Sequence, residues 1–120
     1  DLEVFNSTAS QTSSTYDPVA NKVVISFQGS SQYGTAVVGA VSGNSITFGT
    51  PVVFNGGPTT YTSIIYDPIT NRVVIAYRDS GNSGYGTAIS GAVSGDSISF
   101  GPPVCLTPQT QNTSQRPTTL

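Results

Sequence analysis

Few side chains in this sequence could carry out chemistry. The 120 residues contain no His and a single Cys, so the commonest general base is absent and Cys105 has no imidazole partner to activate it. A carboxylate pair for glycoside hydrolysis would have to come from the six acidic residues, which are Asp1, Glu3, Asp17, Asp67, Asp79 and Asp96. The sequence therefore predicts a protein that is not an enzyme and that uses no cofactor.

Turn formation explains three of these carboxylates. Asp17 and Asp67 each precede a Pro at matching places in a repeated segment, and Asp96 stands where the other copy has Asn44. Asp and Asn favour turns because their side chains bond to nearby backbone groups. The loop 79–84 offers oxygen ligands that calcium could use, but one carboxylate is too little charge for a convincing site. We expect no metal site.

Binding suits the residues better than catalysis does. The loops between the second and third expected strands of the two copies supply aromatic rings beside amide, acidic and guanidinium groups, a set that suits stacking on a sugar and bonding to its hydroxyls. The candidate glycan-binding residues are Tyr33, Tyr85, Arg78, Asp79 and Asn82. The two loops differ in length and charge, and the alternative is that both Tyr side chains are packing residues at strand ends.

An internal repeat organises the chain. The segment 16–27, with the pattern Tyr-Asp-Pro-x-x-Asn-[Lys/Arg]-Val-Val-Ile, returns at 66–77, and the segment 33–49 returns at 85–101. A period of about 50 residues is typical of stacked supersecondary units, which cannot bury their faces alone. We divide the chain into an N-terminal strand and linker at 1–13, repeats at 14–56 and 57–106, and a polar Pro/Thr-rich tail at 107–120.

Each repeat is expected to form four antiparallel strands. The first ends at Tyr16 or Tyr66 and in the second copy covers 61–66, the second covers 22–27 or 72–77, and the third covers 34–41 or 86–93. The fourth covers 46–54, with a kink at 49–51, and its counterpart is 98–106. β-branched and aromatic residues fill the second strand, and Gly with Asn or Asp forms the hairpin turn after the third. No segment has a helical period, so the sequence predicts an all-β fold.

The N-terminus contains one strand more than the repeats need. Val4-Phe5-Asn6 matches Val53-Phe54-Asn55 at the end of a fourth strand. It could be an ordinary edge strand of this chain, or it could complete a sheet in a neighbouring subunit by strand addition. We single out Val4 and Phe5 as the residues of such an assembly strand.

The composition excludes some partners and favours others. Charged residues make up 8% and the net charge is −2, so no basic stripe exists to neutralise nucleic-acid phosphates. The apolar runs are too short for a membrane-spanning helix. Abundant Ser, Thr and Gly suggest an extracellular protein or one on a cell or virion surface, where Asn6 and Asn112 are possible N-glycosylation sites. Cys105 is expected to be a small buried hydrophobe or an inter-chain disulfide partner.

Four short antiparallel strands per repeat resemble the blades of a β-propeller, although no specific propeller motif is present. Two blades do not close a ring, so the resemblance implies a ring of several chains or an open head-to-tail array. A pseudo-symmetric β-sandwich is the alternative fold. We expect a non-enzymatic, extracellular structural protein that self-assembles as a homo-oligomer or polymer. The alternative is a glycan-binding, lectin-like module.

Overall fold

The structure, a computed structural model, describes residues 3–105. It confirms the all-β prediction, because the described residues contain nine strands and no α-helix, only a 3-10 turn at Ser30–Gln32. The strands are β1 Ser10–Asp17, β2 Lys22–Gln28, β3 Tyr33–Ser42, β4 Ser45–Phe48, β5 Val52–Asp67, β6 Arg72–Asp79, β7 Tyr85–Ser94, β8 Ser97–Phe100 and β9 Val104–Cys105.

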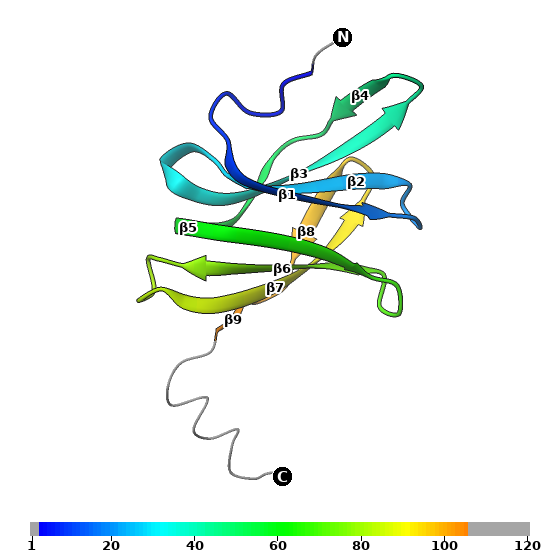
Figure 1. Cartoon of the computed structure of the whole chain (residues 1–120). Helices are drawn as coiled ribbons and strands as arrows, with labels where there is room; N and C mark the ends of the chain where they lie inside the picture. The colour runs from blue at the N-terminus through cyan, green and yellow to red at the C-terminus, as the bar shows by residue number, and fades with distance from the viewer. Residues whose placement is uncertain (1–2, 106–120) are drawn as a thin grey trace.

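All nine strands belong to one antiparallel sheet that does not close on itself (Figure 1). Its order is β1-β2-β3-β5-β6-β7-β8, with β4 beside β3 and β9 beside β7. The 16-residue strand β5 joins the repeats, because its first part pairs with β3 and its second part pairs with β6. The sequence predicted separate strands on either side of the boundary at 56/57, which was wrong. Gly56, Gly57 and Pro58 continue the extended backbone, and Asn55 steadies it by donating to Thr59 Oγ1.

The two repeats have matching backbones. Both first strands carry an irregularity at a residue with positive φ, 56° at Gln11 and 55° at Tyr61, where the pairing register shifts. The hairpins after β3 and β7 turn at Gly43 and Gly95, with φ of 60° and 62°. Glycine fits these two places because a Cβ is disfavoured at positive φ.

The repeated Tyr-Asp-Pro-x-x-Asn motif builds a closed turn. The Asp17 carboxylate accepts from the backbone N–H of Val19 at 3.0 Å and of Ala20 at 3.1 Å. Tyr16 Oη donates to Asn21 Oδ1 at 2.6 Å, and in the second copy Tyr66 Oη donates to Asn71 Oδ1 at 2.9 Å. The motif therefore specifies the turn between the first two strands of each repeat.

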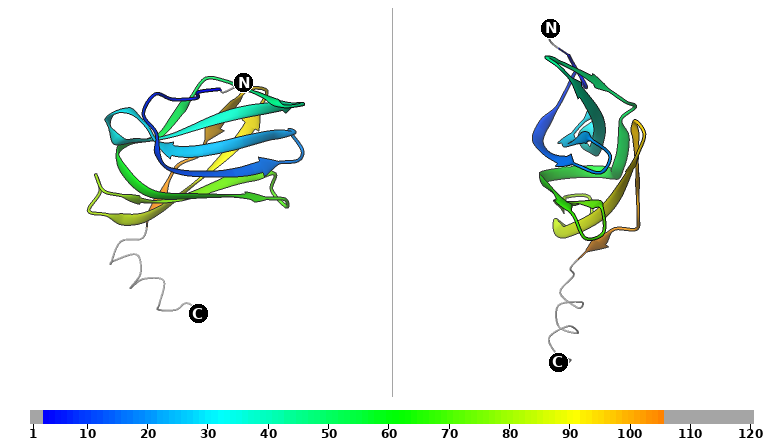
Figure 2. Two further views of the ribbon diagram at one scale, coloured as in Figure 1. Left: turned by 45° about the horizontal axis from the view of Figure 1, so that its top comes forward. Right: turned by 90° about the vertical axis from the view of Figure 1, so that its right-hand side faces the viewer.

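The hydrophobic core lies between the repeats, which sit one above the other in the side view (Figure 2). Strand pairing divides each repeat into two faces. In each repeat we call the face that carries Val24 or its counterpart Val74 the back face, and the face that carries Val23 or its counterpart Val73 the front face. The core is formed by the back face of the first repeat, back face 1, and the front face of the second repeat, front face 2. Back face 1 consists of Val24, Ser26, Ala36 and Val38, and front face 2 consists of Val73, Ile75, Tyr77 and Ile89.

The two repeats therefore pack head to tail, which means that the back face of the first contacts the front face of the second. The remaining faces, front face 1 (Val23, Ile25, Phe27, Thr35 and Val37) and back face 2 (Val74, Ala76, Ala88 and Ser90), lie on opposite sides of the core. All four residues of back face 1 are at most 2% exposed. In back face 2, by contrast, Ala76 and Ser90 are exposed and Val74 and Ala88 are half-buried. Equivalent positions of the two back faces therefore differ in burial, because a neighbouring repeat covers back face 1 but not back face 2.

The spare N-terminal strand is not formed. Residues 3–9 contain no strand, although the matching residues Val53 and Phe54 belong to β5. The physical reason is that a strand needs a neighbouring edge: β3 lies beside 52–55, whereas no described strand pairs with residues 3–9. The Phe5 ring instead packs edge-on against Phe27 at 4.9 Å and Phe48 at 5.4 Å between centroids.

Candidate functional site

Four of the five candidate glycan-binding residues lie together. Arg78 and Asp79 end β6, Asn82 lies in the following loop, and Tyr85 begins β7, where it pairs with Asp79. Tyr33 is apart from them in sequence, at the start of β3, where it pairs with Pro58. The ends of the two loops approach through Pro58, because the Ser80 N–H donates to the Pro58 carbonyl at 2.9 Å.

These loop groups already have partners within the chain. Asp79 Oδ1 accepts from Asn55 Nδ2 at 3.2 Å, and Arg78 donates to Ser80 Oγ at 3.2 Å.

The neighbouring Tyr77 has a raised pKa. Burial, followed by the nearby charges of Asp79 and Cys105, raises the pKa of Tyr77 to about 12. None of the four cavities found among the described residues is lined by any of the five candidates.

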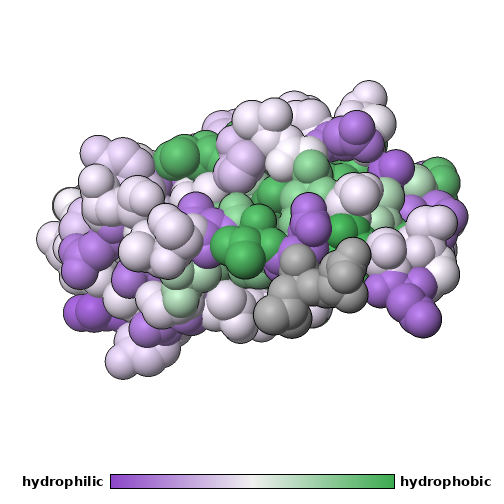
Figure 3. Space-filling model, turned by 90° about the horizontal axis from the view of Figure 1, so that it is seen from above, coloured by the Kyte–Doolittle hydropathy of each residue, from purple (hydrophilic) through white to green (hydrophobic). Residues whose placement is uncertain are grey.

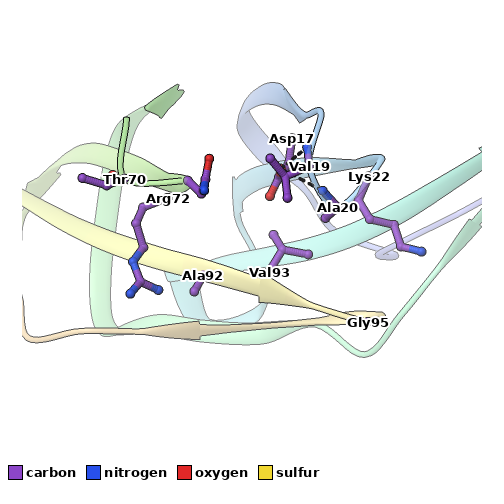
Figure 4. A pocket seen from close by; sticks show the side chains of 10 residues that line it. Asp17, Val19, Ala20, Lys22, Thr70, Arg72, Ala92, Val93 and Gly95 are labelled. Atoms are coloured by element: carbon purple, nitrogen blue, oxygen red, sulfur yellow. Dashed lines mark hydrogen bonds between the residues drawn. The ribbon is translucent and has the colours of Figure 1, made fainter. Parts of the chain in front are cut away.

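The largest of these cavities has a volume of about 500 Å³ and lies away from the 78–85 loop. Figure 4 shows the residues that line it. The two Asp-Pro turns and the β7–β8 hairpin line it. Lys22 forms an ion pair with Asp96 there at 3.7 Å, which joins the first repeat to the second. Burial and the charge of Asp17 raise the pKa of Tyr66. Sequence reasoning missed this cavity, since the motif predicts each turn but not their approach. No cluster of three His, Cys, Asp or Glu side chains suited to a metal occurs in the part of the chain that the structure describes.

Two smaller hollows lie on the faces that have no neighbouring repeat, although Phe27, Thr35 and Val37 of front face 1 are themselves buried. The first, about 260 Å³, is on front face 1 and is lined by Phe5, Thr12, Ser13, Ser14 and Ile25. The second, about 330 Å³, is on back face 2 and is lined by Ala76, Tyr77, Gly86, Thr87, Ala88 and Val104. Seen from above, hydrophobic side chains interrupt the polar surface over the first repeat (Figure 3). Val104 on the second repeat is 67% exposed.

The predicted assembly residues occupy different surroundings. Val4 is 76% exposed, whereas Phe5 is half-buried in the aromatic cluster with Phe27 and Phe48. The sequence analysis identified Phe5 but not the aromatic rings that it contacts. The repeat alignment could have identified these rings. Phe27 and Phe48 correspond to Tyr77 and Phe100, and Phe54 packs against both at 5.1 and 5.7 Å.

Of the remaining three predicted residues, Asn6 and Cys105 lie in the described part of the chain. Asn6 is half-buried, and its Oδ1 accepts from the Thr8 N–H at 2.8 Å. Asn112 lies outside the described residues. Cys105 is half-buried, with its Sγ 3.9 Å from Asn82 Nδ2.

Comparison with known proteins identifies no relative. No family model, no curated protein and no solved structure matches this chain. Within residues 3–105 no helix is long and apolar enough to cross a membrane.

Proposed function

We propose that this chain is a non-enzymatic, extracellular structural protein that self-assembles through its β-repeats. The observation that supports this is the head-to-tail packing of the two repeats. Back face 1 and front face 2 bury each other in the core, which leaves one face of each kind without a neighbouring repeat. A contact between two different surfaces is heterologous, and it generates a ring when the rotation closes and a filament when it does not.

The N-terminal segment provides the junction in this proposal. The beginning of β5, which contains Phe54, pairs with β3 of the first repeat, while the Phe54 ring packs on Tyr77 of the second. Val4 and Phe5 match this strand in sequence, and Phe5 packs on the first repeat in the same way. Residues 3–5 would therefore pair with the β7 edge of another copy by strand addition. They would take the place of β9, which pairs with Thr87 and Ala88 on that edge within the chain.

The test is the assembly state of the purified protein. We expect mass measurement and negative-stain images to show filaments or rings, and removal of residues 1–6 to reduce them to monomers. Val19→Ser is the control, because Val19 is 71% exposed on a turn and outside the proposed junction. An oligomer that survives the deletion unchanged would exclude strand addition, and a monomer at all concentrations would exclude self-assembly.

Glycan binding is the second candidate function, and the clustering of Arg78, Asp79, Asn82 and Tyr85 in one loop favours it. A glycan array tests it directly. Binding that Tyr85→Ala weakens, while Tyr61→Ala on another surface does not, would support it. A silent array would exclude it.

A further inference from the structure

The two smaller hollows lie at positions equivalent to the interface that already exists inside the molecule. We propose that back face 2 of one chain is the docking site for front face 1 of a second copy, with Phe5 at the centre of the contact. This inference rests on the proposed self-assembly and specifies the two surfaces that meet.

The hollow on front face 1 corresponds to part of the core. Its lining residues Phe5, Thr12, Ser13, Ser14 and Ile25 match Phe54, Thr62, Ser63, Ile64 and Ile75 in the repeat alignment. Phe54, Ile64 and Ile75 are all core residues, at most 8% exposed. The same positions that pack against a preceding repeat in the second copy thus line an open hollow in the first.

The hollow on back face 2 corresponds to the surface that receives Phe54. A Cβ built on Gly34 would lie 2.7 Å from the Phe54 ring, so that ring lies directly on the Gly34 backbone. Gly86 is the matching residue of the second repeat, and a Cβ there would meet no atom within 4 Å. Among the described residues, the space that Phe54 fills beside Gly34 is therefore open beside Gly86, between Ala88 and Val104.

Phe5 has the geometry of the missing ring. It packs on Phe27 and Phe48 as Phe54 packs on Tyr77 and Phe100. Docking front face 1 onto back face 2 of a second copy would bring Phe5 over Gly86, provided that the segment 3–5 replaces β9, whose Val104 and Cys105 pair with Ala88 and Thr87 on that edge. The residue of the same chain that aligns with Phe54 is Leu106, which lies outside the described residues.

The chemistry of the two hollows is compatible with this contact. None of their lining residues is charged, so docking would bury apolar surface without desolvating an ion. The internal interface also predicts which residues would meet. Ser26 Oγ lies 3.4 Å from Thr62 Oγ1 across the repeats. The equivalent pair between copies is Ala76 of one chain and Thr12 of the next, and both residues are exposed.

The experiment is a disulfide cross-link between copies. Thr12→Cys and Ala76→Cys are prepared as separate proteins, each with Cys105→Ser, then mixed and oxidised mildly. We expect a covalent heterodimer in the mixture, no dimer of either variant alone, and about a ten-fold lower yield when Ile69→Cys replaces Ala76→Cys. Ile69 is 90% exposed on a turn and serves as the matched control.

The outcomes separate this inference from the proposed function. Assembly that persists without the heterodimer would overturn the docking of these faces and leave self-assembly intact. Dimers of Ala76→Cys alone would show two back faces meeting, which also overturns it. A protein that is monomeric at every concentration would overturn both.

A second pair of variants tests the slot beside Gly86. Gly86→Val should reduce assembly at least ten-fold while the monomer stays folded, because its side chain would occupy the space proposed for Phe5. Gly56→Val is the control, since Gly56 is also exposed with no atom near its Cβ position. Equal assembly of the two variants would contradict the proposal.

Discussion

At the scale of single residues, matching positions of the two repeats have different surroundings. Gly34 is buried under the Phe54 ring, whereas its counterpart Gly86 is exposed. The sequence around both is the same, Tyr-Gly-Thr-Ala. The difference therefore comes from the neighbouring repeat and not from local propensity.

Gly34→Ala should destabilise the fold, whereas Gly86→Ala should not. A methyl group at Gly34 must displace the Phe54 ring, and overpacking of this kind costs about 1–3 kcal/mol. At Gly86 the methyl group has free space, and the less flexible unfolded chain makes the change neutral or slightly favourable. Urea unfolding of dilute protein measures both. Equal losses would contradict the packing described for Gly34.

At the scale of elements, the Asp-Pro turn is the best-defined unit of the chain. Asp67 Oδ1 accepts from the Ile69 N–H at 3.0 Å, and its Oδ2 accepts from Thr70 Oγ1 at 2.9 Å. These bonds favour the ionised carboxylate. The backbone bond to Ile69 and then the Thr70 hydroxyl lower the pKa of Asp67 below its ordinary value of 3.8.

Asp67 should therefore contribute stability that is lost in acid. Because its pKa is lower in the folded state than in the unfolded state, the contribution is present above pH 3.8 and disappears as the pH falls through the lowered folded pKa. Asp67→Asn keeps an acceptor but cannot titrate. We expect the difference in unfolding free energy between wild type and variant to shrink below pH 3.8. A difference that stays constant from pH 6 to pH 2 would contradict this.

At the scale of the whole molecule, the proposed docking takes the internal interface as its template for contacts between copies. Lys22 and Asp96 join the two repeats at 3.7 Å. In the docked pair the equivalent residues are Arg72 of one copy and Asn44 of the next, so the acidic partner is missing.

Asn44→Asp should therefore strengthen self-association. The turn accepts the change because Asp96 occupies the matching place in the second repeat. An exposed ion pair contributes about 0–1 kcal/mol, which corresponds to at most about a five-fold lower dissociation constant at low salt. Sedimentation at low and high salt measures this, since screening should remove the gain. Asn44→Gln is the neutral control, and a gain equal to that of Asn44→Asp would count against the ion pair.

Local sequence patterns predicted part of the fold and part of the candidate sites. The pattern of β-branched residues and Gly-Asn or Gly-Asp turns indicated the second and third strands to within two residues at either end. The prediction of separate strands ending at 54 and beginning at 61 was wrong, because these residues form the single strand β5. Val4 and Phe5 do not form a strand within this chain, because no described strand pairs with residues 3–9. Of the candidate sites, the sequence identified Phe5 and the 78–85 loop but not the cavity between the turns.

The sequence by itself determined the all-β class, the repeat and the Tyr-Asp-Pro-x-x-Asn turns, because these depend on local backbone preferences and short-range hydrogen bonds. Only the tertiary structure decided that back face 1 packs on front face 2, that β5 runs through both repeats, and that Gly86 lies open where Gly34 is covered. The physical reason is that burial depends on what packs against a face and not on the residues of that face alone. Matching sequences therefore differ in burial only when their neighbours differ.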